Sequence, residues 1–235
     1  IRKYGKREGI NINAVRRYGK HMYLALRHLK KCGVLHADIK PDNMIVSENK
    51  TDLKLCDFGS ASLSEEWDVT PYLVSRFYRP PEVILCQQYD HATDVWAIGC
   101  CLYELYTGQI LFPGKTNPEM LKMFIETKGR FPAKSLKKSL SGHQAIERHF
   151  PFDPETGELW YDSIDPVTKK PIKRCLKPPP NPTRDIGVVM LKSAKTETER
   201  KRVNQLKDLI ERSLALDPAR RITPDEALRH SFFQD

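Results

Sequence analysis

The sequence HADIKPDN at residues 36–43, followed by DFG at residues 57–59, decides how the rest of the chain is interpreted. Between these motifs, the apolar run 44–46 and the mostly apolar run 53–56, interrupted by Lys54, predict two short strands, and the polar stretch 47–52 predicts the turn that joins them. The motifs would therefore flank a β-hairpin, with one motif entering it and the other leaving it.

Helical patterns lie on both sides of this hairpin. Upstream, apolar residues at alternating steps of three and four place one face of a helix against a core, as far as about Lys31. Downstream, residues 92–106 are apolar on nearly every face, which is typical of a helix buried inside a lobe, and Gly108 is placed to end it. The residues that share the upstream face are Val15, Tyr18, Met22, Ala25, Leu29 and Cys32.

The second half of the chain predicts three more helices. One covers 117–128, with Asn117 as its N-cap and a proline at the first helical position. Another spans about 199–216, and the last begins at a capping box formed by Thr223 and Glu226. The predicted fold class is therefore mainly α, with one short hairpin.

Periodicity weakens between residues 131 and 198. Lysine clusters and the proline run 178–180 replace regularly spaced apolar residues there. We expect an irregular insert held on the surface of the lobe, with a partly disordered loop as the alternative.

Composition limits the class of protein. The chain has 235 residues, a formal net charge of +9 and six cysteines without paired C-x-x-C spacing. Its longest apolar stretch, residues 95–103, is about half the length needed to cross a bilayer, and no signal sequence opens the chain. We expect a soluble, unsecreted protein with reduced thiols, in the cytosol or nucleus. The charge favours acidic partners such as nucleic acid or phosphoprotein, with a solvated surface as the alternative.

Taken together, the two motifs resemble the catalytic loop and the metal-binding turn of protein kinases, and the resemblance covers essentially the whole chain, as the carboxy-terminal lobe. It implies transfer of a phosphoryl group from ATP to a protein hydroxyl. Asp38 would orient that hydroxyl and accept its proton, and Lys40 would neutralise the transferred phosphoryl. Asn43 and Asp57 would hold Mg²⁺, a hard cation that prefers oxygen ligands.

Two further residues would line the nucleotide. Ile45 would supply an apolar floor under the adenine, and Cys56 would lie beside it, just before the metal-binding aspartate. Each motif alone is a weak signal, because Asp-Phe-Gly is common in turns and His36 could be a satisfied core histidine. Their order and their separation by a predicted hairpin favour the kinase interpretation. The spacing of Asp38 and Lys40 resembles serine/threonine rather than tyrosine kinases.

The segment 72–82 resembles the end of a kinase activation segment, with Pro-Pro-Glu in place of the usual Ala-Pro-Glu. In the family, the glutamate of this motif, here Glu82, is held by a buried arginine, and the matching position is Arg221. Asp94 matches a core-helix aspartate that braces the backbone of the catalytic loop. A cap at the start of that helix is the alternative role for Asp94.

The stretch SRFYR that begins at Ser75 narrows the resemblance to the CMGC group of kinases. Within it, the chain is similar to the dual-specificity tyrosine-regulated kinases and especially to the related pre-mRNA-splicing serine/threonine kinase. The resemblance implies that Tyr72 is phosphorylated and that Arg76 and Arg79 receive the phosphate, with an ordinary packed aromatic as the alternative. Ala37 replaces the arginine that usually senses this phosphate, which leaves the task to those two arginines.

The residues before His36 contain no G-x-G-x-x-G loop, and the strand lysine that grips the phosphates in kinases has no counterpart there. The resemblance therefore implies that residues 1–235 are a fragment without the amino-terminal lobe, with 131–198 as a surface insert. We expect no useful turnover from this polypeptide alone.

Two rival functions stay open. The first is a catalytically dead kinase-like scaffold, which would have no chemical need for the charged groups of the two motifs. The second is a basic ribonucleoprotein-docking module, suggested by the bases between residues 169 and 177, although no RNA-binding motif is recognisable. The resemblance implies protein substrates, including splicing factors, and ribonucleoprotein association. It also implies a monomer without membrane contact, in the nucleus and in the cytoplasm as well.

Overall fold

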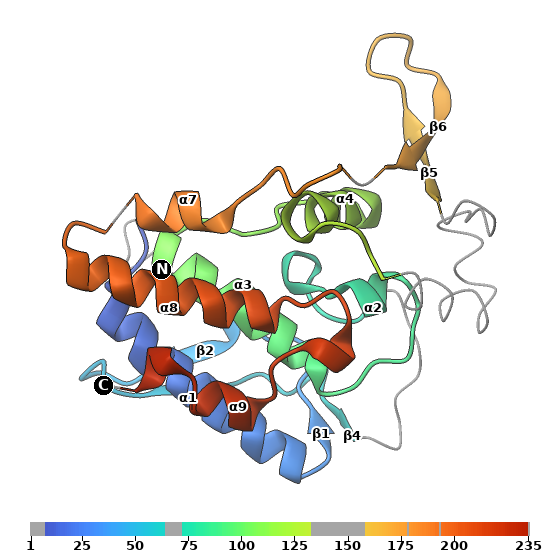
Figure 1. Ribbon diagram of the computed structural model, residues 1–235. Helices are drawn as coiled ribbons and strands as arrows, with labels where there is room; N and C mark the ends of the chain where they lie inside the picture. Colours follow the sequence, from blue (N-terminus) through green and yellow to red (C-terminus); the bar gives the residue numbers. More distant parts are fainter. Residues whose placement is uncertain (1–7, 64–71, 133–157, 178, 193, 235) are drawn as a thin grey trace.

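The computed structural model describes residues 8–63, 72–132, 158–177, 179–192 and 194–234 (Figure 1). Most of its regular structure is helical, as the sequence predicted. The α-helices are α1 (Ile12–Lys31), α2 (Pro81–Ile84), α3 (Ala92–Thr107), α4 (Asn117–Lys128), α7 (Ile186–Leu191), α8 (Glu197–Ser213) and α9 (Pro224–Leu228). Single 3₁₀ turns cover Pro41–Asn43, Arg76–Tyr78, Pro218–Arg220 and Ser231–Phe233. The strands are β1 (Val34–Leu35), β2 (Met44–Val46), β3 (Leu53–Leu55), β4 (Ser62–Leu63), β5 (Leu159–Ile164) and β6 (Pro171–Leu176).

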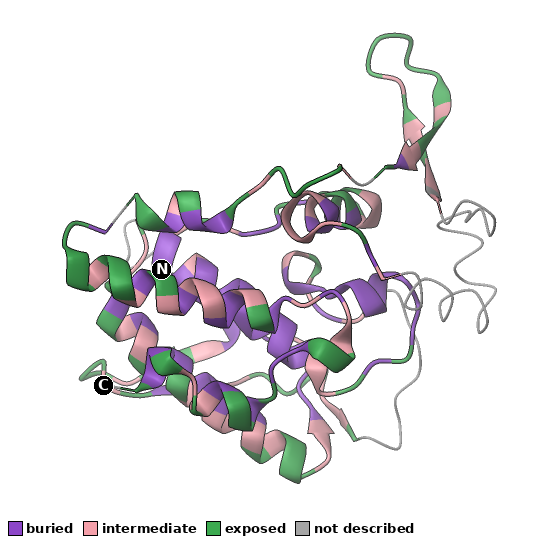
Figure 2. Ribbon diagram, viewed as in Figure 1, coloured by how far each residue is buried: buried purple, intermediate pink, exposed green. Residues whose placement is uncertain are grey.

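Helix α3 forms the centre of the core, packed against α1, α7 and α8 (Figure 1). Nearly all of its residues are buried, which Figure 2 shows as purple along most of the helix. Its Trp96 ring lies 4.8 Å from Phe124 and 5.9 Å from Phe112, between ring centroids. Gly108 ends the helix in the left-handed region with φ of 72°, where the absence of a Cβ removes the strain. The prediction of a central buried helix is confirmed.

Helix α1 buries a wider face than its periodicity predicted. Val15 and Met22 are fully buried, as expected, but so is Tyr23, which lies beside the predicted face. The Tyr23 hydroxyl shares a hydrogen bond of 2.6 Å with Ser213 Oγ on α8. Cys32, which was expected on the buried face, is exposed at the end of the helix. The face is wide because α1 packs against α3, α8 and α9 together.

Three two-stranded antiparallel sheets are present among the described residues. Strands β2 and β3 pair as a hairpin, with Met44 opposite Leu55. Strand β1 pairs with β4, which lies far beyond it in sequence. Residues 36–43 therefore run from β1 to β2, and residues 57–59 lie between β3 and β4. The two small sheets hold the ends of both motifs.

Two helix ends differ from the sequence prediction. The N-cap of α4 is Thr116, whose Oγ1 accepts a hydrogen bond from the Glu119 amide at 3.3 Å, so Asn117 is not the cap. Thr116 has the extended backbone that a cap requires, whereas Asn117 is the first helical residue. Helix α8 begins earlier than predicted, because Thr196 and Glu199 form a capping box that the sequence interpretation overlooked, and it also ends earlier, at Ser213.

The expected irregular insert contains regular structure, and the expectation is wrong for that part. Strands β5 and β6 form a hairpin that stands off the lobe, with Tyr161 opposite Arg174 (Figure 1). Helix α7 packs on α8. The adjacent bases Lys173 and Arg174 break the alternation that would have indicated a strand. The part of the insert at 133–157 lies outside the described residues.

No helix in the described parts of the chain combines the length and the hydrophobicity that crossing a membrane requires.

Candidate active site

The catalytic loop is fixed from beneath by Asp94, on the first turn of α3. The Asp94 carboxylate accepts hydrogen bonds from the backbone amides of His36, at 2.8 Å, and Ala37, at 3.1 Å. Ala37 is buried and has a φ of 62°, a conformation that is costly for a residue with a Cβ. The two charge-assisted hydrogen bonds offset this strain. Burial raises the pKa of Asp94 to about 7, although both amide hydrogen bonds act in the opposite direction.

Asp38 lies at the centre of a hydrogen-bonded cluster on the open side of the same loop. Its Oδ2 is 2.6 Å from Lys40 Nζ and 3.0 Å from Asn43 Nδ2. Its Oδ1 accepts from the Ser75 hydroxyl at 2.6 Å and from the Ser75 amide at 3.2 Å. Lys40 Nζ also donates to Ser75 Oγ at 3.1 Å. The cluster joins the catalytic loop to the segment that follows residue 72.

This arrangement keeps Asp38 ionised. Burial acts to raise the pKa of Asp38, but the hydrogen bonds from Lys40 and Ser75 and the charge of Lys40 outweigh it, so the pKa lies below its ordinary value. One oxygen of the carboxylate thus accepts a hydrogen bond from an aliphatic hydroxyl while a lysine ammonium lies beside the other oxygen. That is the contact by which a carboxylate orients an alcohol for proton removal.

His36 connects the two sequence motifs. Its Nε2 lies 3.2 Å from the Cys56 carbonyl oxygen, and its ring centroid lies 4.8 Å from that of Phe58. The Asp38 amide donates weakly to His36 Nδ1, at 3.4 Å. Burial lowers the pKa of His36 more than its carbonyl and carboxylate neighbours raise it, so the ring is neutral near pH 7. A neutral ring with its proton on Nε2 satisfies both contacts.

Asn43 and Asp57 present the hard oxygens that a magnesium ion prefers. Both hydrogen bonds of the Asn43 amide group run through Nδ2, to the backbone oxygen and side chain of Asp38, and no described group donates to Asn43 Oδ1. Asp57 is exposed, and from the described residues its carboxylate accepts one long hydrogen bond, of 3.3 Å, from the Gly59 amide. These oxygens fit a Mg²⁺ ion that completes its shell with water and phosphate.

The two residues expected at the nucleotide lie on the hairpin that separates the motifs. The side chain of Ile45, on β2, is 59% exposed, and Phe58 is 49% exposed. Cys56 follows β3, is half-buried and has a free thiol. Exposed apolar surface beside polar motifs is available for a planar, partly apolar ligand.

Arg79 holds the backbone of the segment that carries Tyr72. Its guanidinium donates to the carbonyl oxygens of Tyr72, Leu73 and Val74, at 3.0 to 3.2 Å, and to Asn117 Oδ1 at 2.8 Å. Val74 has a φ of 69°, so the clamp also holds a strained residue. Burial lowers the pKa of Arg79, and the charge of a second arginine nearby adds to the effect.

The predicted phosphate-receiving arginines therefore differ in their surroundings. Arg79 is buried and bonded to carbonyls, and its guanidinium lies 5.8 Å from the centroid of the Tyr72 ring. The Arg76 guanidinium has no hydrogen bond or ion pair with the side chains or backbone of other described residues, and the backbone carbonyl oxygen of Arg76 accepts a hydrogen bond from the Arg79 amide. Tyr72 is 64% exposed and is not a packed core aromatic.

Glu82 and Arg221 form a bidentate ion pair at the end of this segment. Both nitrogen–oxygen distances are 2.5 Å, and the two side chains are 1% and 0% exposed. Arg221 also donates to the carbonyl oxygens of Ala215 and Ala92 and lies over the Trp96 ring, 5.0 Å from its centroid. The pair ties the segment to the core around α3.

The sequence analysis missed the contacts that two residues make at this site. Ser75 was assigned only to the activation segment, although its hydroxyl contacts Asp38. Asn117 was interpreted as a helix cap, although its side chain accepts from Arg79. No local sequence signal identifies either contact, because each joins residues that are about 37 positions apart in the chain.

Comparison with known proteins identifies relatives over the whole chain. Residues 2–233 match the family described as protein kinase domain. The chain is 47% identical to the serine/threonine-protein kinase prpf4B of Dictyostelium discoideum, over 100% of the chain and 28% of that relative. It is also 47% identical to the serine/threonine-protein kinase prp4 of Schizosaccharomyces pombe, over 99% of the chain and 47% of that relative.

A more distant relative is the dual specificity tyrosine-phosphorylation-regulated kinase 2 of Drosophila melanogaster, 34% identical over 96% of the chain and 28% of that relative. The chain thus spans less than half the length of each of these three proteins. The chain is more similar to the kinases prpf4B and prp4 than to the dual specificity kinase, which confirms the resemblance that the SRFYR stretch predicted.

Proposed function

Because this chain belongs to the protein kinase family, we propose that it forms the catalytic lobe of a serine/threonine kinase that transfers the γ-phosphoryl of ATP to protein hydroxyls. The observation that supports this most directly is the Asp38 cluster. An ionised carboxylate accepts a hydrogen bond from a serine hydroxyl at 2.6 Å, with a lysine ammonium 2.6 Å from its other oxygen.

Asp38 takes the role of the base. Its carboxylate orients the attacking hydroxyl of the substrate and receives its proton as the bond to phosphorus forms. Lys40 lies beside the same carboxylate, where its charge stabilises the negative charge that develops on the transferred group. Asn43 holds Asp38 in place through two hydrogen bonds.

Asn43 and Asp57 would hold the magnesium ion that accompanies ATP. When bound, this ion neutralises the phosphate charge and helps to align the triphosphate. The chain's own contribution is one amide oxygen and one exposed carboxylate, on either side of the β2–β3 hairpin. Ile45 would lie under the adenine, with Cys56 close to the nucleotide.

Tyr72 is the proposed modification site of the activation segment. The ring is exposed to a modifying enzyme, and added phosphate would lie near two arginines. Arg76 would make the first contact, because Arg79 is already bonded to three backbone carbonyls. Ala37 removes the arginine that would otherwise compete for the phosphate.

The relatives support a finer proposal about the cell. Serine/threonine kinases at 47% identity in two organisms favour the splicing-kinase subfamily over other members of the group. We place the protein in the nucleus, with protein substrates among splicing factors and with ribonucleoprotein association. The net charge of +9 suits such acidic surroundings.

A polypeptide of residues 1–235 is proposed to have no useful turnover by itself. Asp38, Asn43 and Asp57 supply one side of an ATP site, and these residues include no glycine-rich loop to cover the phosphates. The region 131–198 is proposed as a surface insert of the lobe.

The test measures phosphoryl transfer by the purified protein at its natural length, using radiolabelled ATP and a splicing-factor extract. Asp38→Asn is expected to lower kcat roughly 100-fold to 10,000-fold, because a general base is lost. Asp42→Asn is the matched control, since Asp42 is exposed in the same loop and is expected to leave kcat unchanged. Equal activity of Asp38→Asn and the wild type would overturn the proposal.

A further inference from the structure

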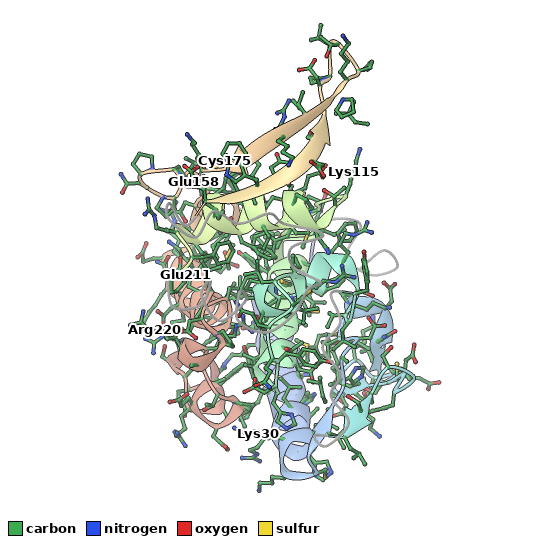
Figure 3. All side chains as sticks on the ribbon, turned by 90° about the vertical axis from the view of Figure 1, so that its right-hand side faces the viewer. Lys30, Lys115, Glu158, Cys175, Glu211 and Arg220 are labelled. Atoms are coloured by element: carbon green, nitrogen blue, oxygen red, sulfur yellow. The ribbon has the colours of Figure 1, made fainter. Side chains whose placement is uncertain are left out.

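A groove separates α4 from the β5–β6 hairpin, away from the catalytic loop. Its volume is about 680 Å³, and its floor is apolar where Ile125 of α4 faces Leu176 and Tyr161 of the hairpin. Ile125 and Leu176 are buried, and Tyr161 packs against the main core. Figure 3 shows the hairpin lying over α4, with Glu158 and Cys175 near its base. The groove therefore has a fixed wall on either side.

Basic side chains line the rim of this groove. Lys122 comes from α4, and Arg174 and Lys177 come from the end of the hairpin. Residues 169–177 contain five bases and no acid. Among the described residues, Arg174 has no ion-pair partner within 4.0 Å. The rim is thus mainly positive, whereas farther along the hairpin Asp162 lies opposite Lys173.

The acidic residues near the rim form only weak ion pairs with its lysines. Lys122 lies 3.8 Å from Glu126, and Lys177 lies 3.9 Å from Glu158. The two lysine side chains are 61% and 76% exposed, so solvent screens each ion pair and it contributes little. A carboxylate or phosphate on a partner can replace either acid at little cost.

Most of the hairpin's outer part does not pack against the lobe. Ile164 is 66% exposed and Val167 is 85% exposed, whereas burial is concentrated at the base, around Leu176. An isolated two-stranded hairpin is only marginally stable in water. The outer surface is therefore available for a contact with another molecule.

We propose that this groove binds an acidic, extended peptide segment of a partner protein, with one apolar side chain of that segment seated on the floor. The positive rim attracts the acidic side chains of the peptide, and burial of its apolar side chain on the floor contributes to the affinity. RNA fits less well, because the floor is largely aliphatic and its one described aromatic side chain, Tyr161, is partly buried against the core. The proposal concerns binding alone and does not rest on phosphoryl transfer.

The test uses fluorescence anisotropy with the purified protein at its natural length. The probe is a labelled glutamate-rich peptide with one central leucine. We expect saturable binding that weakens at least about tenfold in the double variant Arg174→Glu, Lys177→Glu, because two attractive contacts become repulsive. Replacing the leucine by serine is expected to weaken the wild-type affinity as well.

Two further variants keep this result interpretable. Lys122→Glu lies on α4 and is expected to weaken binding even if the hairpin substitutions disturb the hairpin. Lys30→Glu is the matched control, because Figure 3 shows Lys30 at the opposite end of the molecule, and it is expected to bind like the wild type. Phosphorylation of a short peptide without acidic residues should be unchanged in all of them, which separates a failure of docking from a failure of catalysis.

Two outcomes would overturn the proposal. One is unchanged peptide affinity in both Lys122→Glu and the double variant. The other is tighter binding of a labelled oligouridylate than of the peptide, lost through the same substitutions, which would make the groove a nucleic-acid site.

Discussion

The catalytic loop has a buried side and an open side. The charged groups on the buried side are enclosed within the chain, whereas those on the open side are at least partly exposed. On the buried side, the carboxylates of Asp94 and Glu82 are enclosed, and every contact they make lies within the chain. On the open side, Asp38 is partly exposed and Asp57 is exposed. The first group fixes the backbone, whereas the second presents oxygens to other molecules.

The difference indicates that the buried side contributes mainly to stability and the open side mainly to chemistry. A fully buried ion pair leaves an uncompensated charge when one partner is removed, so its loss is expensive. An exposed carboxylate that accepts one long hydrogen bond can be altered with little effect on folding. Substitutions on the two sides should therefore separate unfolding free energy from activity.

The largest expected effect on stability is that of Arg221→Ala. Removing this guanidinium leaves Glu82 buried without its partner and should lower the free energy of unfolding by about 3–5 kcal/mol. Chemical denaturation measures this loss. The neighbouring Arg220→Ala is the control, because Arg220 is exposed and should change stability by less than about 0.5 kcal/mol. Similar losses in both variants would remove the basis for the comparison.

The next largest effect concerns the pH dependence of stability. The pKa of Asp94 is about 7 in the folded chain, above its ordinary value, so the folded state holds that proton more tightly than the unfolded state. The contribution of Asp94 should therefore decrease by roughly 4 kcal/mol as pH rises from about 4 to about 8, and then stay constant.

Asp94→Asn removes this titration and provides the measurement. The difference in unfolding free energy between the variant and the wild type should change across that pH window and be flat above it. Taking the difference also cancels His36, whose lowered pKa acts in the opposite direction, with stability lost as pH falls below about 6.5. A difference that is independent of pH would show that Asp94 stays ionised throughout.

The sequence was informative where a local pattern determines the structure. The all-round apolar pattern of 92–106 predicted α3, and the capping box at Thr223 predicted the start of α9. The hairpin between the motifs followed from two short apolar runs and a polar turn. Each of these features depends on residues within a few positions of one another.

Prediction was poorer where distant residues decide the outcome. Thr116 and Asn117 are both good N-caps, and the contact of the Asn117 side chain with Arg79, which is distant in sequence, favours the threonine in that role. The β5–β6 hairpin was hidden because adjacent bases break its alternation. The sequence motif identified Asp38 and Lys40. It did not predict that Ser75 lies beside them, because that position depends on how the segment after residue 72 folds back.

Asn117→Ala should have a smaller effect, about 0.5–1.5 kcal/mol, because it removes one hydrogen bond to a guanidinium that keeps its carbonyl partners. The loss should appear locally, as faster hydrogen exchange of the Tyr78 and Arg79 amides. Asn117→Asp keeps an acceptor for Arg79 and should restore slow exchange. Equally fast exchange in both variants would mean that helix α4, and not this hydrogen bond, controls the segment.

The smallest expected change in stability is that of Asp57→Asn, which lies on the open side. Asp57 is exposed, and the amide oxygen of asparagine can still accept from the Gly59 amide, so the unfolding free energy should change by less than about 0.5 kcal/mol. Nucleotide binding should behave differently, because a neutral amide is a poorer magnesium ligand than a carboxylate. In calorimetric titrations of the protein at its natural length, chelating Mg²⁺ should weaken ATP binding by the wild type but change the already weak binding of Asp57→Asn little. If Asp57→Asn instead unfolds as easily as Arg221→Ala, the carboxylate is part of the structural framework, and the distinction between the two sides of the loop is wrong.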